Sequence, residues 1–396
     1  MKRFVLVFAL AVGLLTSAST MQAQVNMSRY ITLTVTNGAA IKLDFRAASA
    51  GTPVRIVSGS NTQNITVDTV WSTSTGYNTD GTTMTVYGDI TGLNCYYNYM
   101  NLTGLDVSNN TELMSLSCDN NQLTTLDVSK NTKLTSLSCT YNQISSLDVS
   151  KNTKLTMFDC NGNNLSNLNI SNNTELKELN CSNNQLSGLD ISKNTKLTML
   201  NCSNNQFITL NVSKNTLLTD LSCSSNQLSS LDISKNTKLA MLDCYGNKFT
   251  TAAIDSIYCT LPIRQEADSA IIYPVKDSSD PNHATVIAST KKNAIDKNWK
   301  VKYNDTYTNI PATTGSYVCF ATDIAESRTE QALNLYPNPV VDMLYLSATA
   351  RTIRIYNMYG TEVAHATDTD CVEVSHLPAG VYTVKADSSI AKMVKR

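Results

Sequence analysis

Apolar residues recur between residues 113 and 259 in a fixed order that repeats every 21 positions. One copy, residues 134–154, reads LTSLSCTYNQISSLDVSKNTK, and the copies share the pattern LxxLxCxxNxLxxLDVSxNTx. Within this copy, Leu137 and Cys139 flank Ser138, which is the inward, outward, inward alternation that a short strand requires. A fixed period of this length predicts a solenoid in which equivalent strands stack in parallel.

Cysteine occupies one position of the repeat without interruption, and Cys95 lies 23 residues before the first regular copy. We interpret these side chains as buried thiols, because Cys is among the most often buried residues and no paired CxxC or Cys/His spacing indicates a metal site. Disulfides between neighbouring repeats are an alternative, since strands about 4.8 Å apart permit them although parallel Cβ directions oppose them. The predicted cysteine ladder is Cys118, Cys139, Cys160, Cys181, Cys202, Cys223 and Cys244.

Asparagine follows each of these cysteines by three residues, and we expect it to form a buried amide ladder that bonds backbone groups left unpaired by the turning chain. This asparagine ladder is Asn121, Asn142, Asn163, Asn184, Asn205, Asn226 and Asn247. On the return side of the coil, carboxylates are expected to cap the following turn. These residues are Asp127, Asp148, Asp190 and Asp232.

The repeat resembles the leucine-rich repeat and, in its cysteine column, internalin-like bacterial repeats. The resemblance implies a β-rich solenoid with a parallel sheet and a right-handed coil. About eight repeats are predicted over residues 91–262, and the irregular first copy carries a two-residue insertion around Tyr99. Solenoids need their open ends covered. Alternating runs such as YITLTVT and AIKLDF therefore predict an N-terminal β cap over residues 24–90.

The C-terminal flank is predicted to combine a helix with strands. TAAIDSIYCTL (251–261) has helical spacing of its apolar residues. Four pieces of residues 263–330 are typical of strands, namely AIIYPV, ATVIAS, WKVKY and SYVCFA, and TDIAESRTEQ is typical of a linker. The acidic run Asp277 to Asn282 is compatible with a calcium loop, but we favour a solvated turn.

The outward side chains of the strands form the surface that a ligand would meet. This surface is small, polar and mildly acidic, with adaptable methionines two repeats apart and tyrosines near its N-terminal end, including Tyr96, Tyr97 and Tyr99. We predict that it is a concave binding face, against the alternative of a repetitive surface that simply stays solvated. The predicted binding residues are Met157, Asp159, Glu178, Asn180, Met199, Asn201, Asp220, Asp243 and Tyr245.

Composition argues against nucleic-acid binding and catalysis. The formal net charge is −1, and no Arg lies between residues 93 and 250, so nothing indicates phosphate recognition. Of the three histidines only His283 lies outside the C-terminal region. No GxSxG, HExxH, Walker A or Rossmann motif is present, and we predict neither enzyme activity nor a metal or cofactor.

Both ends of the chain indicate export. Lys2 and Arg3 precede an apolar run from Phe4 to Leu15, which is typical of a secretory signal peptide over residues 1–23. Near the other end, NLYPNPVVDMLYL, TIRIYNMYGTEV and LPAGVYTVKA predict a small antiparallel β-sandwich. Residues 331–396 resemble the type A C-terminal sorting domain of type IX secretion in Gram-negative Bacteroidota. The matching positions are Tyr336, Pro337, Asn338, Pro339, Gly360, Gly380, Tyr382, Lys392 and Lys395.

Together these features predict an exported leucine-rich repeat protein, attached to the cell surface or released, that uses the type IX machinery through its C-terminal domain. We expect adhesin-like binding to an extracellular protein of a host or another bacterium. The alternative is a structural or glycan-contacting surface protein without a defined protein partner.

Overall fold

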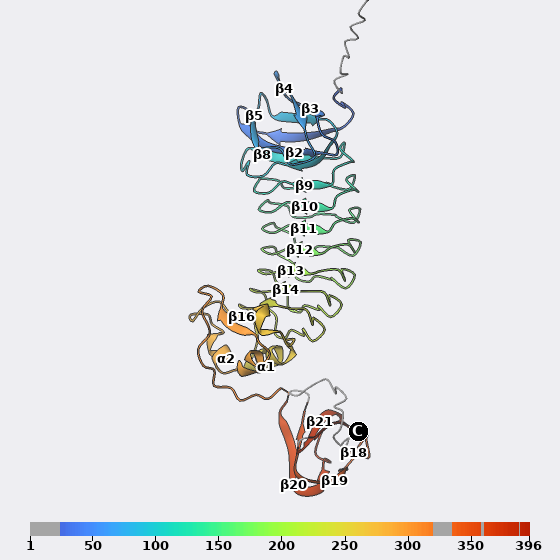
Figure 1. Ribbon diagram of the computed structural model, residues 1–396, viewed down its shortest axis with the longest axis vertical. Helices are drawn as coiled ribbons and strands as arrows, with labels where there is room; N and C mark the ends of the chain where they lie inside the picture. The colour runs from blue at the N-terminus through green and yellow to red at the C-terminus, as the bar shows by residue number, and fades with distance from the viewer. Residues whose placement is uncertain (1–23, 320–334, 358–359, 388) are drawn as a thin grey trace, which may run out of the picture. The chain divides into compact units, whose positions relative to one another are not determined.

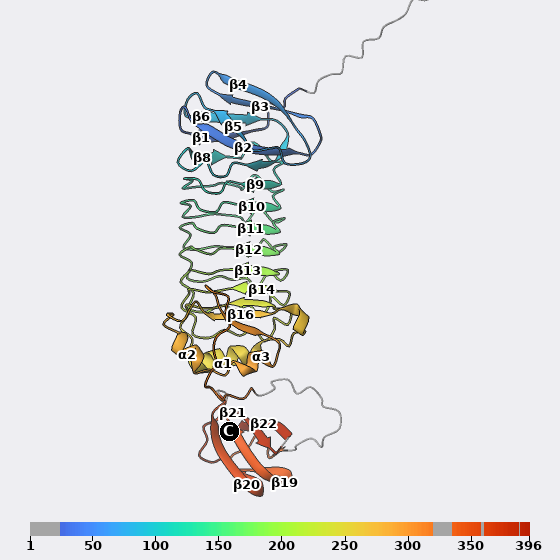
Figure 2. The same cartoon turned by 60° about the vertical axis from the view of Figure 1, so that its left-hand side comes forward.

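The computed structural model describes residues 24–319, 335–357, 360–387 and 389–396. The predicted signal peptide and the predicted linker TDIAESRTEQ lie outside these residues. The chain divides into two compact units, Met1–Gln206 (unit 1) and Phe207–Arg396 (unit 2). Figures 1 and 2 show the elements of each unit.

Unit 1 begins with antiparallel strands whose alternate side chains are buried. One sheet has the order β4-β3-β6-β1-β8, and β2 pairs with β5 on one side and with β7 on the other. In β1, Ile31, Leu33 and Val35 are buried while Thr34 is exposed, which is the period of two expected for a strand. The bounds are β1 Tyr30–Val35, β2 Ala40–Ala47, β3 Thr52–Ser58, β4 Asn61–Val67, β5 Thr75–Asn78, β6 Thr83–Tyr87, β7 Ile90–Asn94 and β8 Leu102–Asp106.

The first repeat strand of unit 1 pairs in parallel with β7, and each further strand pairs with the strand before it. Figure 1 shows the resulting stack. These strands are β9 Ser115–Ser117, β10 Ser136–Ser138, β11 Met157–Asp159, β12 Glu178–Asn180 and β13 Met199–Asn201. Each strand pairs with equivalent residues of the neighbouring repeat, so the central residues of the strands form one buried column. This column is Leu116, Leu137, Phe158, Leu179 and Leu200. The predicted leucine-rich repeat solenoid with a parallel sheet is therefore confirmed.

Unit 2 contains two further repeat strands, β14 Asp220–Ser222 and β15 Met241–Asp243, and the parallel pairing continues through β16 Ile271–Val275 and β17 Lys300–Tyr303. The helix α1 Thr251–Thr260 begins where the side chain of Thr250 accepts a hydrogen bond from the Ala253 N–H. It packs against α2 His283–Ile287 and α3 Lys292–Ile295. A 3₁₀ turn, Glu266–Asp268, precedes β16.

The structure corrects one strand prediction in this flank. The segment ATVIAS lies in α2 and the turn after it, where Val286 is buried and the Ala288 N–H donates to the Ala284 carbonyl. The misassigned segment is short and apolar, and periodicity alone does not separate a buried strand from a single helical turn. The described part of SYVCFA, residues 316–319, is not in a strand either.

The last strands of unit 2 are antiparallel, as predicted. They are β18 Leu335–Tyr336, β19 Met343–Tyr356, β20 Glu362–Glu373, β21 Gly380–Ala386 and β22 Ser389–Lys395. Their connectivity is β18-β19-β21-β22, with β20 also paired to β19, and they enclose an apolar core that includes Leu344, Ile353 and Val384.

Candidate binding surfaces

The outward side chains of β9–β13 form the sheet face of unit 1. Met157, Glu178 and Met199 are register partners on adjacent strands, so the three side chains lie side by side. Glu178 is exposed, and Met157 and Met199 expose 44% and 46% of their surface. The structure thus brings together three of the predicted binding residues in one apolar and charged row.

The neighbouring row of the same face is polar and internally bonded. Asp159, Asn180 and Asn201 are register partners. The Asn180 Nδ2 donates to Asp159 Oδ2 at 3.1 Å, and the backbone N–H of Ser203 donates to Asn201 Oδ1 at 3.1 Å. Burial raises the pKa of Asp159, opposed by hydrogen bonds from Asn161 and Asn180. Each of these side chains therefore has a hydrogen-bond partner within the repeats.

Unit 2 carries the remaining predicted residues, Asp220, Asp243 and Tyr245. The Thr219 hydroxyl donates to Asp220 Oδ2 at 2.6 Å. Asp243 is the register partner of Tyr273, and burial raises the pKa of its carboxyl group to about 7. Tyr245 is half-buried, and its backbone N–H bonds the Asp243 carboxylate. Asp220 and Asp243 therefore have hydrogen-bond partners within unit 2.

The cysteine ladder lies in the core of the repeats of each unit. All seven repeat cysteines and Cys95 are buried free thiols. The thiols of Cys95 and Cys118 lie 3.5 and 3.6 Å from the carbonyl oxygens of Ser117 and Ser138, within reach of weak S–H hydrogen bonds. Burial raises the pKa of these thiols, that of Cys181 to about 12. The thiols therefore fill the core as predicted and are far from nucleophilic at neutral pH.

Within each unit, the asparagine ladder joins neighbouring repeats. Asn142 Nδ2 donates to the carbonyl oxygens of Cys118 and Cys139 at 3.0 and 3.1 Å, and its Oδ1 accepts from the Leu123 N–H at 3.0 Å. Asn98, which sequence reasoning missed, occupies the same position three residues after Cys95. The spacing from Cys95 was the available signal, and the insertion after Asn98 obscured it.

A second asparagine ladder also escaped prediction. These side chains belong to the NT dipeptide of each repeat and are fully buried. Asn131 Nδ2, for example, donates to the carbonyl oxygens of Val107 and Asn110 at 3.0 and 2.8 Å. The period of 21 was the signal that could have found it. The ladder comprises Asn110, Asn131, Asn152, Asn173, Asn194, Asn215 and Asn236.

The return side of the coil is exposed and charged. The backbone N–H groups of Ser129 and Ser150 donate to the carboxylates of Asp127 and Asp148 at 2.8 Å, and these hydrogen bonds lower the pKa of both side chains. Asp190 and Asp232 cap Ser192 and Ser234 in the same way.

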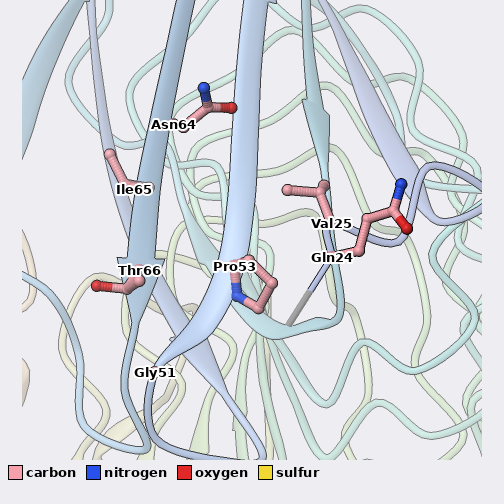
Figure 3. A pocket seen from close by; sticks show the side chains of 7 residues that line it. All are labelled: Gln24, Val25, Gly51, Pro53, Asn64, Ile65 and Thr66. Atoms are coloured by element: carbon pink, nitrogen blue, oxygen red, sulfur yellow. The ribbon is translucent and has the colours of Figure 1, made fainter. Parts of the chain in front are cut away.

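Two pockets lie in the N-terminal part of unit 1. The larger, about 710 Å³, lies beside β3 and β4 (Figure 3) and is lined by Gln24, Val25, Gly51, Pro53, Asn64, Ile65 and Thr66. It contains no charged side chain. The other, about 520 Å³, lies against β2 and β5, and we call it the tyrosine pocket. It is lined by Ala40, Lys42, Ser74, Gly76, Tyr96, Tyr97 and Tyr99.

His283 has a structural environment. Its Nε2 lies 2.7 Å from the Tyr303 hydroxyl oxygen and the two rings stack. In the nearby turn, Asp277 accepts the Ser279 N–H and Asp280 accepts the Lys276 N–H, which is the solvated-turn arrangement. Among the described residues, no cluster of His, Cys, Asp and Glu is arranged to hold a metal ion. In the described ranges no helix has the length and apolar character needed to span a membrane.

The predicted sorting residues converge although they are distant in sequence. Asn338 Nδ2 donates to the Lys392 carbonyl at 2.7 Å, and Asn338 Oδ1 accepts from the Val394 N–H at 2.8 Å. Gly380 and Lys395 are register partners, and Tyr382 donates from its hydroxyl to the Pro378 carbonyl at 2.7 Å. The Tyr336–Pro337 and Asn338–Pro339 peptide bonds are cis. Gly360 adopts a φ of +76°, which favours glycine.

Comparisons with known proteins give one family match and several similar structures. Residues 334–396 match the family of secretion system C-terminal sorting domains, and no curated protein sequence matches the chain. The chain is similar to the functional domain of InlJ from Listeria monocytogenes, which includes a cysteine ladder, at 19% identity over 80% of this chain and 93% of that chain, with a TM-score of 0.38. It is also similar to an internalin (inlF) from Listeria monocytogenes, at 21% identity over 58% of this chain and 69% of that chain, with a TM-score of 0.42. A leucine-rich repeat protein from Leptospira interrogans is 23% identical over 39% of this chain and 43% of that chain, with a TM-score of 0.38.

The sorting domain marks the chain for the type IX secretion machinery and for delivery to the cell surface or the medium. The repeat period, the parallel register of its strands and the buried cysteine ladder define the remainder of the fold. The chain therefore combines a solenoid of leucine-rich repeats with a secretion system C-terminal sorting domain, which marks it for export.

Proposed function

We propose that this exported chain is an adhesin-like binding protein whose unit 1 sheet face holds an extracellular protein. The observation that supports this proposal is the row of Met157, Glu178 and Met199 on adjacent strands. Two half-exposed methionines flank one exposed carboxylate on a surface that is otherwise small and polar. Methionine is frequent at adaptable binding surfaces because its unbranched, polarizable side chain repacks against different partners.

The charge of this row indicates the chemistry of the partner. Glu178 forms no ion pair among the described residues, whereas Asp159 in the next row is bonded to Asn180. A partner that places an Arg or Lys against Glu178 and apolar side chains against the methionines would complement the row. Removal of such a charged pair from water is favourable only with good geometry, so Glu178 contributes specificity and the methionines contribute buried area.

A binding role agrees with the internal bonding of the ionisable groups elsewhere in the repeats. The carboxylates on the return side cap turns, and His283 in the flank is bonded to Tyr303. We therefore propose that the repeats recognise and do not catalyse. A purely structural role, or contact with surface glycan without a protein partner, is the competing function, and the experiment below distinguishes them.

The test uses the full chain with a photo-crosslinking residue at position 199 and, as a control, at the exposed return-side position 151. A protein crosslinked from 199 and not from 151 would be purified, and its affinity for the unmodified chain measured directly. Glu178→Lys and Met199→Arg should each weaken binding at least tenfold, while Lys151→Glu should leave it unchanged. Equal affinities for all variants, or the lack of a saturable protein partner, would contradict the proposal.

A further inference from the structure

We propose that the tyrosine pocket of unit 1 binds a saccharide that carries a carboxylate, such as a hexuronate unit. Its volume of about 520 Å³ lies within the range of roughly 300–1,000 Å³ that is usual for small-ligand sites. The pocket shares no residue with the row of Met157, Glu178 and Met199. Loss of binding at one site is therefore not evidence against binding at the other.

The walls of the pocket are aromatic rings with polar tips. Tyr96 and Tyr97 meet edge to face with ring centroids 5.1 Å apart, and Tyr97 and Tyr99 have centroids 5.9 Å apart. Tyr97 and Tyr99 nevertheless expose 48% and 59% of their surface. A pyranose has an apolar C–H face and a rim of hydroxyl groups, which match the negative face of a tyrosine ring and its hydroxyl group.

The floor of the pocket is made from the smallest side chains. Gly76 is the register partner of Lys42 on the neighbouring strand, and Ala40 lies beside it. A Cβ atom at Gly76 would meet only the Ala40 Cβ, at 3.6 Å, which is ordinary contact. Backbone packing therefore does not require glycine at this position. The glycine leaves room between the strand and the tyrosine rings. Among the described residues that line the pocket, the only aliphatic side chain is the methyl group of Ala40, so the pocket lacks the larger apolar side chains that would enclose an apolar peptide residue.

Lys42 supplies the positive charge of the pocket, and hydrogen bonds hold its backbone in place. Its backbone N–H donates to Asn98 Oδ1 at 2.7 Å, and its carbonyl accepts from Asn98 Nδ2 at 3.0 Å. This clamp joins β2 to the loop that carries the tyrosines. The Lys42 side chain is exposed and forms no ion pair within the described ranges. An anionic group on the sugar would complement this ammonium group.

The backbone conformation of Tyr97 and Tyr99 indicates that these tyrosines have a functional role. Tyr97 and Tyr99 have φ values of +55° and +49°, in the left-handed region that bulky residues rarely adopt. Their N–H groups bond the carbonyls of Asp119 and Asn120, which fixes this conformation. At the position of Tyr97, later repeats of unit 1 carry Asn or Gly, except for Tyr141: Asn120, Gly162, Asn183 and Asn204. A tyrosine retained where Asn or Gly is favoured costs stability, and such strain concentrates at binding sites.

Calorimetric titration of the full chain with digalacturonate and with the neutral disaccharide galactobiose tests the proposal. We expect digalacturonate to bind at least tenfold more tightly than galactobiose, and Lys42→Gln to remove that preference. Tyr97→Asn should weaken digalacturonate binding at least tenfold without loss of thermal stability, because Asn suits the left-handed backbone. Gly76→Val should fill the floor and abolish binding.

The matched control is Tyr141→Asn, which makes the same change at the equivalent position of the next repeat but one and outside the pocket. This variant should bind digalacturonate as the unmodified chain does. If the Tyr97→Asn, Gly76→Val and unmodified chains bound digalacturonate equally well, the tyrosine pocket would not be the binding site. The choice of a saccharide would be wrong if an acidic peptide bound more tightly than digalacturonate and the Gly76→Val variant no longer bound that peptide. Equal binding of the two disaccharides would overturn the role of Lys42.

Discussion

The side-chain amide of Asn163 donates a 2.9 Å hydrogen bond to the carbonyl oxygen of Cys139 in the preceding repeat. The same nitrogen donates to the Cys160 carbonyl at 3.1 Å, and Asn163 Oδ1 accepts from the Ile144 N–H at 3.0 Å. One buried side chain thus satisfies backbone groups of two repeats. Because each repeat contacts only its neighbours, these bonds are a principal polar link along the coil.

We predict that Asn163→Leu destabilises unit 1 strongly. The substitution leaves the buried Ile144 N–H without its partner, which costs about 1–3 kcal/mol. It also removes one of two amide donors from each of the Cys139 and Cys160 carbonyls, at about 1 kcal/mol for each lost hydrogen bond. The loss should therefore be roughly 3 kcal/mol or more, visible as a lower urea midpoint by circular dichroism. Asn164→Ala, at the exposed neighbouring position, is the control and should unfold like the unmodified chain. A matching midpoint for both variants would show that the ladder does not stabilise the coil.

The ladder thiols are predicted to resist alkylation in the folded chain. Burial raises the pKa of these thiols, so the reactive thiolate is both scarce and inaccessible at pH 8. Cys371 in the sorting domain is only partly buried and should react first. Iodoacetamide labelling followed by peptide mass spectrometry should find modification at Cys371 alone, and at the ladder only after denaturation. Rapid native labelling of Cys139 or Cys160 would contradict the inert-core interpretation.

The repeats were predictable from sequence because each repeat position has the same surroundings in every copy. Leu137, Cys139 and Asn142 occupy equivalent sites in a stack, so a period of 21 translates directly into inward columns and an amide ladder. The buried thiols and the parallel strands therefore required no knowledge of distant contacts.

Features that depend on distant contacts were not predictable in the same way. The tyrosine pocket forms because β2 and β5 lie beside the insertion in the first repeat. Gly76 and Tyr97 line the same pocket although they are far apart in sequence. The helix α2 is only five residues long, and tertiary bonds fix the chain around it, such as the one from the Thr290 N–H to Asp255 Oδ1 at 2.7 Å. A periodic pattern carries no information about either arrangement.

The disulfide between Cys259 and Cys319 was also missed, because neither cysteine belongs to the periodic ladder and their pairing depends on a contact between distant parts of the sequence. Their Cα atoms are 5.3 Å apart although 60 positions separate them in sequence. The bond ties the end of α1 to residue 319 and closes the flank around β16 and β17. Such a crosslink suits an exported chain, because oxidising compartments preserve disulfides.

We predict that loss of this disulfide lowers the stability of unit 2. Closure of a 60-residue loop restricts the unfolded chain and is worth about 4 kcal/mol on entropic grounds. The double variant Cys259→Ser/Cys319→Ser should melt at a lower temperature than the unmodified chain, and reductant should affect only the latter. Cys371→Ser is the matched control, since Cys371 is a free thiol. An unchanged melting temperature in the double variant would refute this contribution.

The final prediction concerns the pH dependence of unit 2 through Asp243. Burial raises the pKa of its carboxyl group from 3.8 to about 7, and its Oδ1 is buried without a hydrogen-bond partner. Because the folded state binds the proton more tightly than the unfolded state, this group destabilises the fold progressively as pH rises from about 4 to about 7. Above pH 7 the penalty is constant and at most about 4 kcal/mol, at about 1.4 kcal/mol for each unit of pKa.

Asp243→Asn removes this charge while keeping the size of the side chain and an acceptor oxygen for the Ser224 hydroxyl, which lies 3.4 Å from Asp243 Oδ2. The variant should therefore be more stable than the unmodified chain at pH 8, with a gain that shrinks steadily toward pH 4. Melting temperatures measured across this range by circular dichroism check the prediction. Asp232→Asn is the control, because that carboxylate caps the Ser234 N–H in an exposed turn. A gain from Asp243→Asn that is the same at pH 4 and pH 8 would assign the effect to packing and not to ionisation.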